Sequence, residues 1–140
     1  MKTLYTLYED KLIRLKDTQG NEFTGTADVF PAEYGLHEFG REEEGIQIGE
    51  YLIFRSEIDS VEILPTYEEA AKTIPLGKYR HFKGKEYEVI AIARHSETME
   101  AMVVYRALYG EGGVWVRPAD MWNETVERDG KTFRRFTPVE

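Results

Sequence analysis

A single helix signal interrupts a chain whose other segments favour strands. Thr66 occupies the position of an N-cap residue, Glu69 follows at the third helical position as in a capping box, and residues 70–72 are good helix formers. Pro75 ends this helix, because a proline disfavours helical geometry in the residue before it and has no N–H group to donate. The pattern predicts one short helix between two β modules; a helix inside one continuous domain is the alternative.

The segments on either side of this helix are each long enough for a small β domain. We expect a first β module over residues 1–64, a helix and linker over residues 65–76, and a second β module over residues 77–140. Hydrophobic residues make up 41% of the chain and aromatic residues 13%, which is enough apolar surface for a packed core. The expected fold class is all-β, mainly strands with one short helix, arranged as two tandem small β-barrels.

Strand patterns in the first module occur in pairs. Residues 11–16 alternate between apolar and polar side chains, a polar turn follows, and residues 22–30 return as the second strand of a hairpin. We expect an acidic, glycine-containing loop over residues 33–45 and further strands over residues 46–55 and 57–64.

The two strand-rich ends of the first module carry a family resemblance. Residues 12–30 and 54–63 are similar to the two halves of an Sm-like fold, and the resemblance extends over residues 5–64. It implies a small, strongly bent five-stranded barrel. It also implies assembly through edge strands, so a homo-oligomer is a possible state of the protein.

The RNA-contacting positions of the Sm-like family are not matched here. Asp28 agrees with an aspartate of its first motif, but residues 32–35 read Ala-Glu-Tyr-Gly where that family has an asparagine, and Arg55-Ser56 replaces its Arg-Gly. Residues 1–74 hold seven Lys or Arg and sixteen Asp or Glu, a net charge of −9. Because phosphate backbones are bound by basic surfaces, generic nucleic-acid binding is not expected of this half.

The second module has longer apolar runs. Residues 87–95, 102–109 and 114–117 each read as a strand bounded by turn residues. Residues 110–113 are rich in glycine, but they lie between two strands and have neither a following helix nor the Lys-Ser/Thr pair of a phosphate-binding loop. They are therefore interpreted as a hairpin tip.

A second hairpin is predicted near the end of the chain. Asp129-Gly130 favours the positive φ angles of a two-residue type I′ turn, with strands over residues 125–128 and 131–136. Five or six short strands with tight connections indicate an SH3-like barrel for this module.

Three motifs of the second module also carry a resemblance. They read GKYRHFKG at residues 77–84, ARHSE at residues 93–97 and VYRALYGEGGVWVRP at residues 104–118. With these motifs, residues 77–136 resemble a bacterial family described as a domain of unknown function. The resemblance implies a module and no particular activity.

Arginine, histidine and aromatic residues are interleaved along this module and form its candidate binding face. Arginine binds planar carboxylate or phosphate groups through two parallel hydrogen bonds and stacks on rings, and strands brought side by side in a barrel let distant residues converge. Single aromatic residues more often serve the core. The predicted ligand-binding residues are Tyr79, His81, Arg94, His95, Tyr105, Trp115 and Arg117. A nucleotide, a peptide carboxylate or a single-stranded nucleic-acid segment would suit such a face.

No catalytic or metal-binding constellation is predicted. His95-Ser96-Glu97 is reminiscent of a catalytic triad, but neighbouring residues on a strand point to opposite faces. His37, His81 and His95 lie in three separate segments without the spacing of metal ligands, and the chain has no cysteine. We expect no metal and no cofactor, and whether the protein is an enzyme stays open.

Three functional hypotheses follow from these patterns. A module that binds a small ligand, a peptide or a protein partner is favoured, a structural protein that assembles through the first module is second, and a small enzyme is third. No run of apolar residues is long enough to span a membrane, and the N-terminus turns acidic before the apolar core of a signal peptide develops. The predicted location is the cytoplasm of a bacterium, without a membrane partner.

Overall fold

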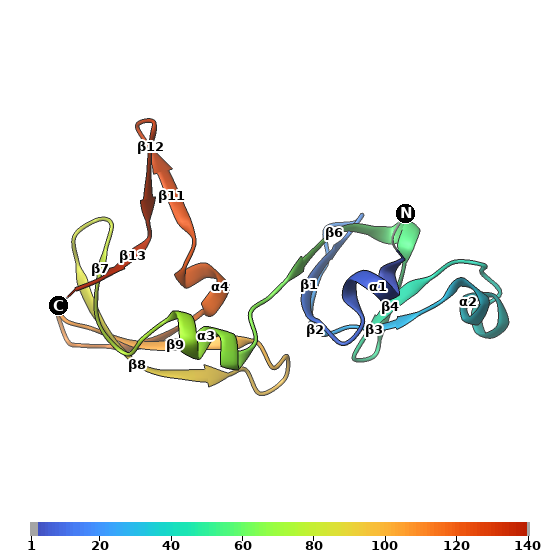
Figure 1. The fold of residues 1–140 in the computed structure, drawn as a ribbon, viewed down its shortest axis with the longest axis horizontal. Helices are drawn as coiled ribbons and strands as arrows, with labels where there is room; N and C mark the ends of the chain where they lie inside the picture. The colour runs from blue at the N-terminus through green and yellow to red at the C-terminus, as the bar shows by residue number, and fades with distance from the viewer. Residues whose placement is uncertain (1–2, 140) are drawn as a thin grey trace. The chain divides into compact units, whose positions relative to one another are not determined.

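A computed structural model describes residues 3–139 of the chain. The chain divides into two compact units, one that runs to Leu64 and includes residues 96–99, and one that comprises Pro65–His95 and the residues from Glu100 onward (Figure 1). Hydrogen-bonded sheets stay within one unit or the other. No helix within residues 3–139 has the length and apolar character needed to cross a membrane.

Over residues 3–64, the first unit contains six short strands, two α-helices and one 3-10 helix. In chain order its elements are α1 (Leu4–Tyr8), β1 (Leu12–Asp17), β2 (Glu22–Thr26), β3 (Asp28–Phe30), α2 (Ala32–Phe39), β4 (Gly45–Ile48), β5 (Tyr51–Phe54), the 3-10 helix η1 (Arg55–Glu57) and β6 (Ile58–Ile63). They form two three-stranded antiparallel sheets, with strand orders β2-β1-β6 and β3-β4-β5. Because only Ala27 separates β2 from β3, the chain passes from one sheet to the other through a bent strand.

The alternating pattern of β1 produces the core of this unit. Ile13 and Leu15 point to the same side of the strand and are fully buried, together with Ile46 of β4. Neither sheet closes on itself within the described residues. The Sm-like barrel and its assembly through edge strands stay predictions.

The segment predicted as an acidic loop contains a helix. α2 begins after Pro31 and ends at Gly40, whose φ of 73° is the left-handed conformation typical of a helix end. Gly35 in its middle weakens the helix signal in the sequence. The glycine is required by packing, because a Cβ atom at this position would lie 2.3 Å from the carbonyl oxygen of Glu43.

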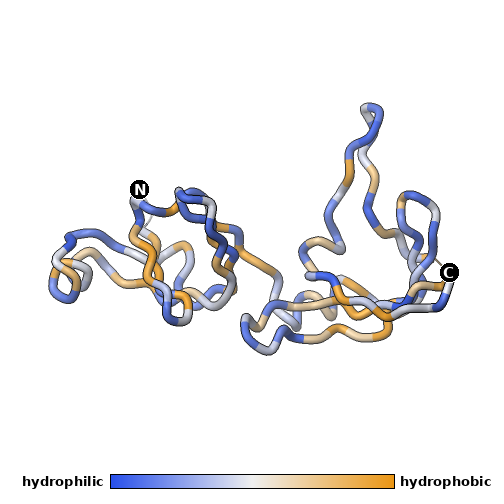
Figure 2. Tube along the Cα trace, turned by 180° about the vertical axis from the view of Figure 1, so that it is seen from behind, coloured by the Kyte–Doolittle hydropathy of each residue, from blue (hydrophilic) through white to orange (hydrophobic). Residues whose placement is uncertain are grey.

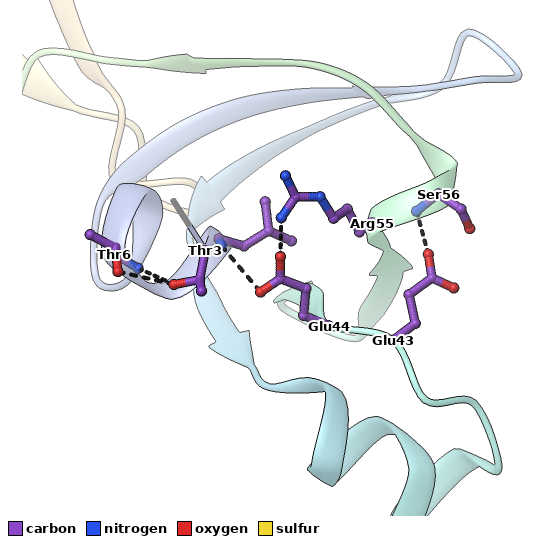
Figure 3. A network of polar contacts seen from close by, with 7 residues as sticks. Thr3, Thr6, Glu43, Glu44, Arg55 and Ser56 are labelled. Atoms are coloured by element: carbon purple, nitrogen blue, oxygen red, sulfur yellow. Dashed lines mark hydrogen bonds and ion pairs between the residues drawn. The ribbon is translucent and has the colours of Figure 1, made fainter. Parts of the chain in front are cut away.

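Two carboxylates after α2 hold the returning chain in place. Figure 3 shows Glu44 accepting hydrogen bonds from the backbone N–H of Leu4, at 3.2 Å, and from Arg55, while Glu43 accepts one from the backbone N–H of Ser56. Hydrogen bonding with Ser56 lowers the pKa of Glu43, and the nearby Arg41 lowers it by a smaller amount. Glu43 and Glu44 thus connect the segment after α2 to α1 and η1.

The second unit centres on one five-stranded antiparallel sheet. In chain order its elements are α3 (Tyr67–Thr73), β7 (Gly77–His81), β8 (Glu86–Arg94), β9 (Ala101–Ala107), β10 (Val114–Pro118), α4 (Ala119–Trp122), β11 (Thr125–Arg128), β12 (Lys131–Arg134) and β13 (Phe136–Pro138). The sheet has the strand order β10-β9-β8-β7-β13, and β11 and β12 form a separate hairpin. This sheet is also open within residues 3–139, so the SH3-like barrel stays a prediction.

The predicted capping box is confirmed. The Thr66 hydroxyl accepts a hydrogen bond from the Glu69 N–H at 3.2 Å, and the Glu69 carboxylate accepts one from the Thr66 N–H at 3.1 Å. The helix ends at Ile74, immediately before Pro75. Mainly β architecture is confirmed as well, but α1, α2 and α4 are additional helices that the sequence pattern did not predict.

The core of the second unit is aromatic. Trp122 of α4 and Phe136 of β13 stack with their ring centroids 3.7 Å apart and an interplanar angle of 1°. Val89 and Val103 of the central strands are fully buried beside them. Figure 2 shows the hydrophobic residues along the strands of this sheet and hydrophilic residues at the tip of the β11–β12 hairpin.

The β11–β12 hairpin has the predicted turn. Asp129 and Gly130 adopt φ angles of 55° and 75°, and Arg128 pairs with Lys131 across the turn. The second strand is shorter than expected, since it ends at Arg134 and the chain then leaves the hairpin to form β13 on the edge of the larger sheet.

Substitution of Gly130 by valine is expected to lower the free energy of unfolding of the second unit by about 1 kcal/mol or more, because a β-branched residue resists positive φ. Urea unfolding measures the change. Gly130→Asn is the matched control, since asparagine tolerates this conformation and should cost less. Equal stability of the two variants and the unchanged protein would contradict the turn assignment.

Candidate ligand-binding site

The register of the five-stranded sheet gathers aromatic side chains on one face, which we call the inner face. Tyr79 pairs with Tyr87 across β7 and β8, and Val89 pairs with Tyr105 across β8 and β9. Paired residues of antiparallel strands point to the same side, so all four belong to the face that carries the core. α3 and α4 pack against strands of this sheet.

Two of the predicted binding residues are core residues. Tyr79 and Tyr105 are only 3% and 8% exposed, and both rings contact Trp122. The Tyr79 hydroxyl donates a hydrogen bond to the carbonyl oxygen of Pro75 at 2.7 Å, which ties β7 to the end of α3. Burial raises the pKa of Tyr79. Both tyrosines therefore belong to the core and are not exposed to a ligand.

Arg117 reaches across the inner face. It lies on the edge strand β10, yet its guanidinium carbon is 5.7 Å from the ring centroid of Phe136, which belongs to the opposite edge strand β13. The two edges of the sheet therefore approach each other. Among residues 3–139 the buried Nε of Arg117 has no hydrogen-bond partner, and the guanidinium forms no ion pair. Arg117 is thus a half-buried cation that packs near an aromatic ring and has no ion-pair partner among the described residues.

His81 lies beside this cation. Its ring is half-buried, with centroid distances of 4.6 Å to Phe82 and 5.0 Å to Phe136. Burial lowers the pKa of His81, and the positive charges of Arg135, Lys83 and Arg117 lower it further. Its Nδ1 accepts a hydrogen bond from the Lys83 N–H at 3.2 Å, so neutral His81 carries its proton on Nε2.

A hydrogen-bonded pair of tyrosines, Tyr87 and Tyr109, also lies beside Phe136. The hydroxyl groups of Tyr87 and Tyr109 are 2.8 Å apart, and the Tyr87 ring packs edge-on against Phe136 with the centroids 5.7 Å apart. Burial and the hydrogen bond with Tyr109 raise the pKa of Tyr87 to about 12, although the charge of Arg117 acts in the opposite direction. Arg117, His81 and Tyr87 all lie next to the Phe136 ring. We call His81, Tyr87, Tyr109, Arg117 and Phe136 the Arg117 site.

The remaining predicted residues lie outside the Arg117 site. Arg94 shares the inner face by register, but its guanidinium stacks 4.2 Å above the Tyr67 ring and pairs with Glu68 at 3.8 Å, both on α3. His95 follows the end of β8, where its N–H donates to the carbonyl oxygen of Glu100 at 2.7 Å. Trp115 pairs with Tyr105 but lies on the edge strand with 61% of its surface exposed.

Three members of the Arg117 site, Tyr87, Tyr109 and Phe136, were not among the binding residues predicted from the sequence. Tyr87 follows the same alternation as Val89 and was recognisable as a residue of the inner face. Phe136 gave no signal, because its place depends on β13 returning to the edge of the sheet. No group of three or more His, Asp or Glu side chains within residues 3–139 is placed to hold a metal ion.

Comparison with known proteins identifies the second unit. A family model described as a protein of unknown function, DUF1653, matches residues 77–138. The crystal structure of a DUF1653 protein from Bordetella bronchiseptica is 38% identical in sequence and covers 49% of this chain and 90% of that chain, with a TM-score of 0.46. The chain belongs to the DUF1653 family. This confirms the resemblance inferred from the motifs of residues 77–136. No curated protein matches the chain.

The DUF1653 segment runs from β7 to β13 and contains the whole Arg117 site. Within this segment, His81 should make stability depend on pH. Because its pKa is lowered on folding from an ordinary value of 6.5, the unfolded chain binds more protons between the two pKa values. The free energy of unfolding should therefore rise with pH up to about 6.5 and level off above it.

Urea unfolding at a series of pH values between about 5 and 8, the range in which histidine titrates, measures this slope. His81→Gln should flatten it, whereas His37→Gln, at an exposed histidine of the first unit, should leave it unchanged. The same slope in the His81 variant and the unchanged protein would contradict the prediction.

Proposed function

We propose that the DUF1653 module is a binding module that holds a small anionic ligand at the Arg117 site. The observation that carries the proposal is the convergence of Arg117, His81 and Tyr87 around the Phe136 ring, from three different strands. Arg117 has no carboxylate partner among residues 3–139, so its charge is available to a ligand. A planar guanidinium binds a carboxylate or phosphate group through two parallel hydrogen bonds.

The other groups of the site suit the same ligand. Neutral His81 offers its Nε2–H as a hydrogen-bond donor. Tyr87 and Tyr109 each carry one hydroxyl hydrogen, and their mutual hydrogen bond uses one of the two, so the other hydrogen can be donated to a ligand. Lys85, whose ammonium lies 4.3 Å from the Tyr109 ring centroid, adds positive charge nearby. Hydrogen-bond donors and cations together favour an anion rich in acceptor atoms.

A thermal-shift and calorimetry screen with carboxylates, phosphate esters and nucleotides tests the proposal. A ligand present at 100 times its dissociation constant should stabilise the protein by about 2.7 kcal/mol. Arg117→Lys keeps the charge but loses the planar fork, so it should weaken binding by roughly tenfold while stability changes little.

Arg106→Lys is the matched control, since Arg106 lies on β9, next to β10, but pairs with Glu88 at 3.7 Å outside the Arg117 site. This control should bind like the unchanged protein. Absence of any ligand in the screen, or equal binding by the Arg117 and Arg106 variants, would overturn the proposal. Trp115→Ala is less diagnostic, because it removes apolar area from the edge strand as well as from the predicted face.

A further inference from the structure

A pocket on the second unit is lined mainly by cationic and aromatic side chains. It lies where the turn between β7 and β8 meets the β11–β12 hairpin, and its volume is about 310 Å³. Its lining residues are Phe82, Lys83, Arg128, Asp129, Lys131 and Phe133. In Figure 1 the β7–β8 turn and the hairpin extend from the same side of the five-stranded sheet. We call this the hairpin pocket, and it shares no residue with the Arg117 site.

Two cations converge on one ring of the hairpin pocket. The guanidinium carbon of Arg128 is 5.4 Å from the Phe82 ring centroid, and the ammonium of Lys83 is 5.8 Å from the same point. The Phe82 N–H donates to the carbonyl oxygen of Arg135 at 2.9 Å, which fixes the turn to the base of the hairpin. Two elements far apart in the sequence are therefore joined around an aromatic ring.

The charge of the hairpin pocket is positive. Lys83, Arg128 and Lys131 face a single carboxylate, that of Asp129, and none of the three cations forms an ion pair with another residue of the described chain. This excess occurs on a protein with a net charge of −8. The positive charge is therefore local, which suits a small anion better than an extended polyanion.

The rings of the hairpin pocket supply stacking surfaces. Phe82 is half-buried, and Phe133 is 42% exposed although it is a large apolar side chain. An aromatic ring next to lysine and arginine side chains is the combination that binds a nucleobase and its phosphate. The volume falls at the lower end of small-molecule pockets, which begin at about 300 Å³. It suits one nucleotide.

From these observations we infer that the hairpin pocket binds a nucleoside monophosphate. The base stacks on Phe82 and Phe133, and the phosphate is held by Lys83, Arg128 and Lys131. The inference is independent of the ligand proposed for the Arg117 site.

NMR titration of the full chain with AMP, adenosine and inorganic phosphate tests the inference. AMP should shift the backbone amide signals of Phe82, Lys83 and residues 128–133. Adenosine lacks the phosphate and phosphate lacks the base, so each should bind at least about tenfold more weakly than AMP. AMP signals confined to His81, Tyr87 and Arg117 would overturn this inference while supporting the Arg117 site.

Substitutions identify which groups hold the nucleotide. Arg128→Ala and Lys131→Ala should each weaken AMP binding by roughly tenfold, because a charge-assisted hydrogen bond is lost. Phe133→Ala should weaken it by a similar factor through lost stacking, and its exposed position makes loss of folding a small concern. Arg134→Ala removes an exposed cation outside the pocket and should leave binding unchanged.

Two results would overturn the inference. One is AMP binding of equal strength in the Arg128, Lys131 and Arg134 variants, which would make the contact a general effect of charge. The other is binding of a short single-stranded oligonucleotide without measurable binding of AMP, which would assign the surface to nucleic acid.

Discussion

Trp122→Ala is expected to lower the free energy of unfolding of the second, C-terminal unit by about 3–5 kcal/mol, the range measured when large buried aromatic residues are truncated. Trp122 is 1% exposed, stacks on Phe136 and contacts both Tyr79 and Tyr105. Its removal leaves a cavity at the point where α4 closes over the inner face of the sheet. Most small domains have only about 5–15 kcal/mol of stability, so the variant should unfold at much lower urea concentrations.

Two further variants separate packing from other causes. Trp122→Phe keeps most of the ring and removes an indole N–H that is buried without a partner among the described residues, so it should cost less than the alanine variant. Met121→Ala changes a neighbouring residue of α4 that is 37% exposed and should have a small effect. A loss below about 1 kcal/mol for Trp122→Ala would contradict its role as a core residue.

Gly45→Ala is expected to destabilise the first, N-terminal unit by about 1–3 kcal/mol, the usual effect of overpacking a core. A Cβ atom at this position would lie 2.5 Å from the Phe30 ring and 2.7 Å from the carbonyl oxygen of Ile53. Phe30 is not free to yield, because its ring centroid lies 5.7 Å from that of Tyr34 and 5.7 Å from that of Phe39 on α2.

Circular dichroism during urea unfolding measures the effect of the Gly45 substitution. Gln47→Ala is the matched control, since Gln47 is an exposed residue of the same strand, β4. The control should stay close to the unchanged protein. If Gly45→Ala is as stable as the control, the close approach of Phe30 and Ile53 is not a constraint on this position.

Local chemistry decided which features of the fold could be predicted. The capping box of Thr66 and Glu69 involves residues three positions apart, and the turn at Asp129-Gly130 depends on two adjacent residues. Such signals are complete within a short stretch of sequence. Helix α2 was missed because a glycine in its middle weakens the helix signal. The reason for Gly35 is its close approach to the carbonyl oxygen of Glu43, which lies outside the helix.

The candidate site was predictable only as far as strand alternation extends. Alternation and an antiparallel sheet suffice to place Tyr79, Tyr105 and Arg117 on one face. They do not reveal that Phe136 comes to lie beneath Arg117, or that Tyr67 and Glu68 of α3 engage Arg94. Both contacts depend on how the chain packs after the strands have paired.

The placement of the tryptophans also determines what fluorescence can report. The chain has two tryptophans, and both belong to the C-terminal unit. Trp122 is 1% exposed, so its emission should be shifted to the blue and protected from acrylamide, whereas Trp115 is 61% exposed and should be readily quenched. Tryptophan emission therefore follows the C-terminal unit alone, and unfolding of the N-terminal unit is spectrally silent in this signal.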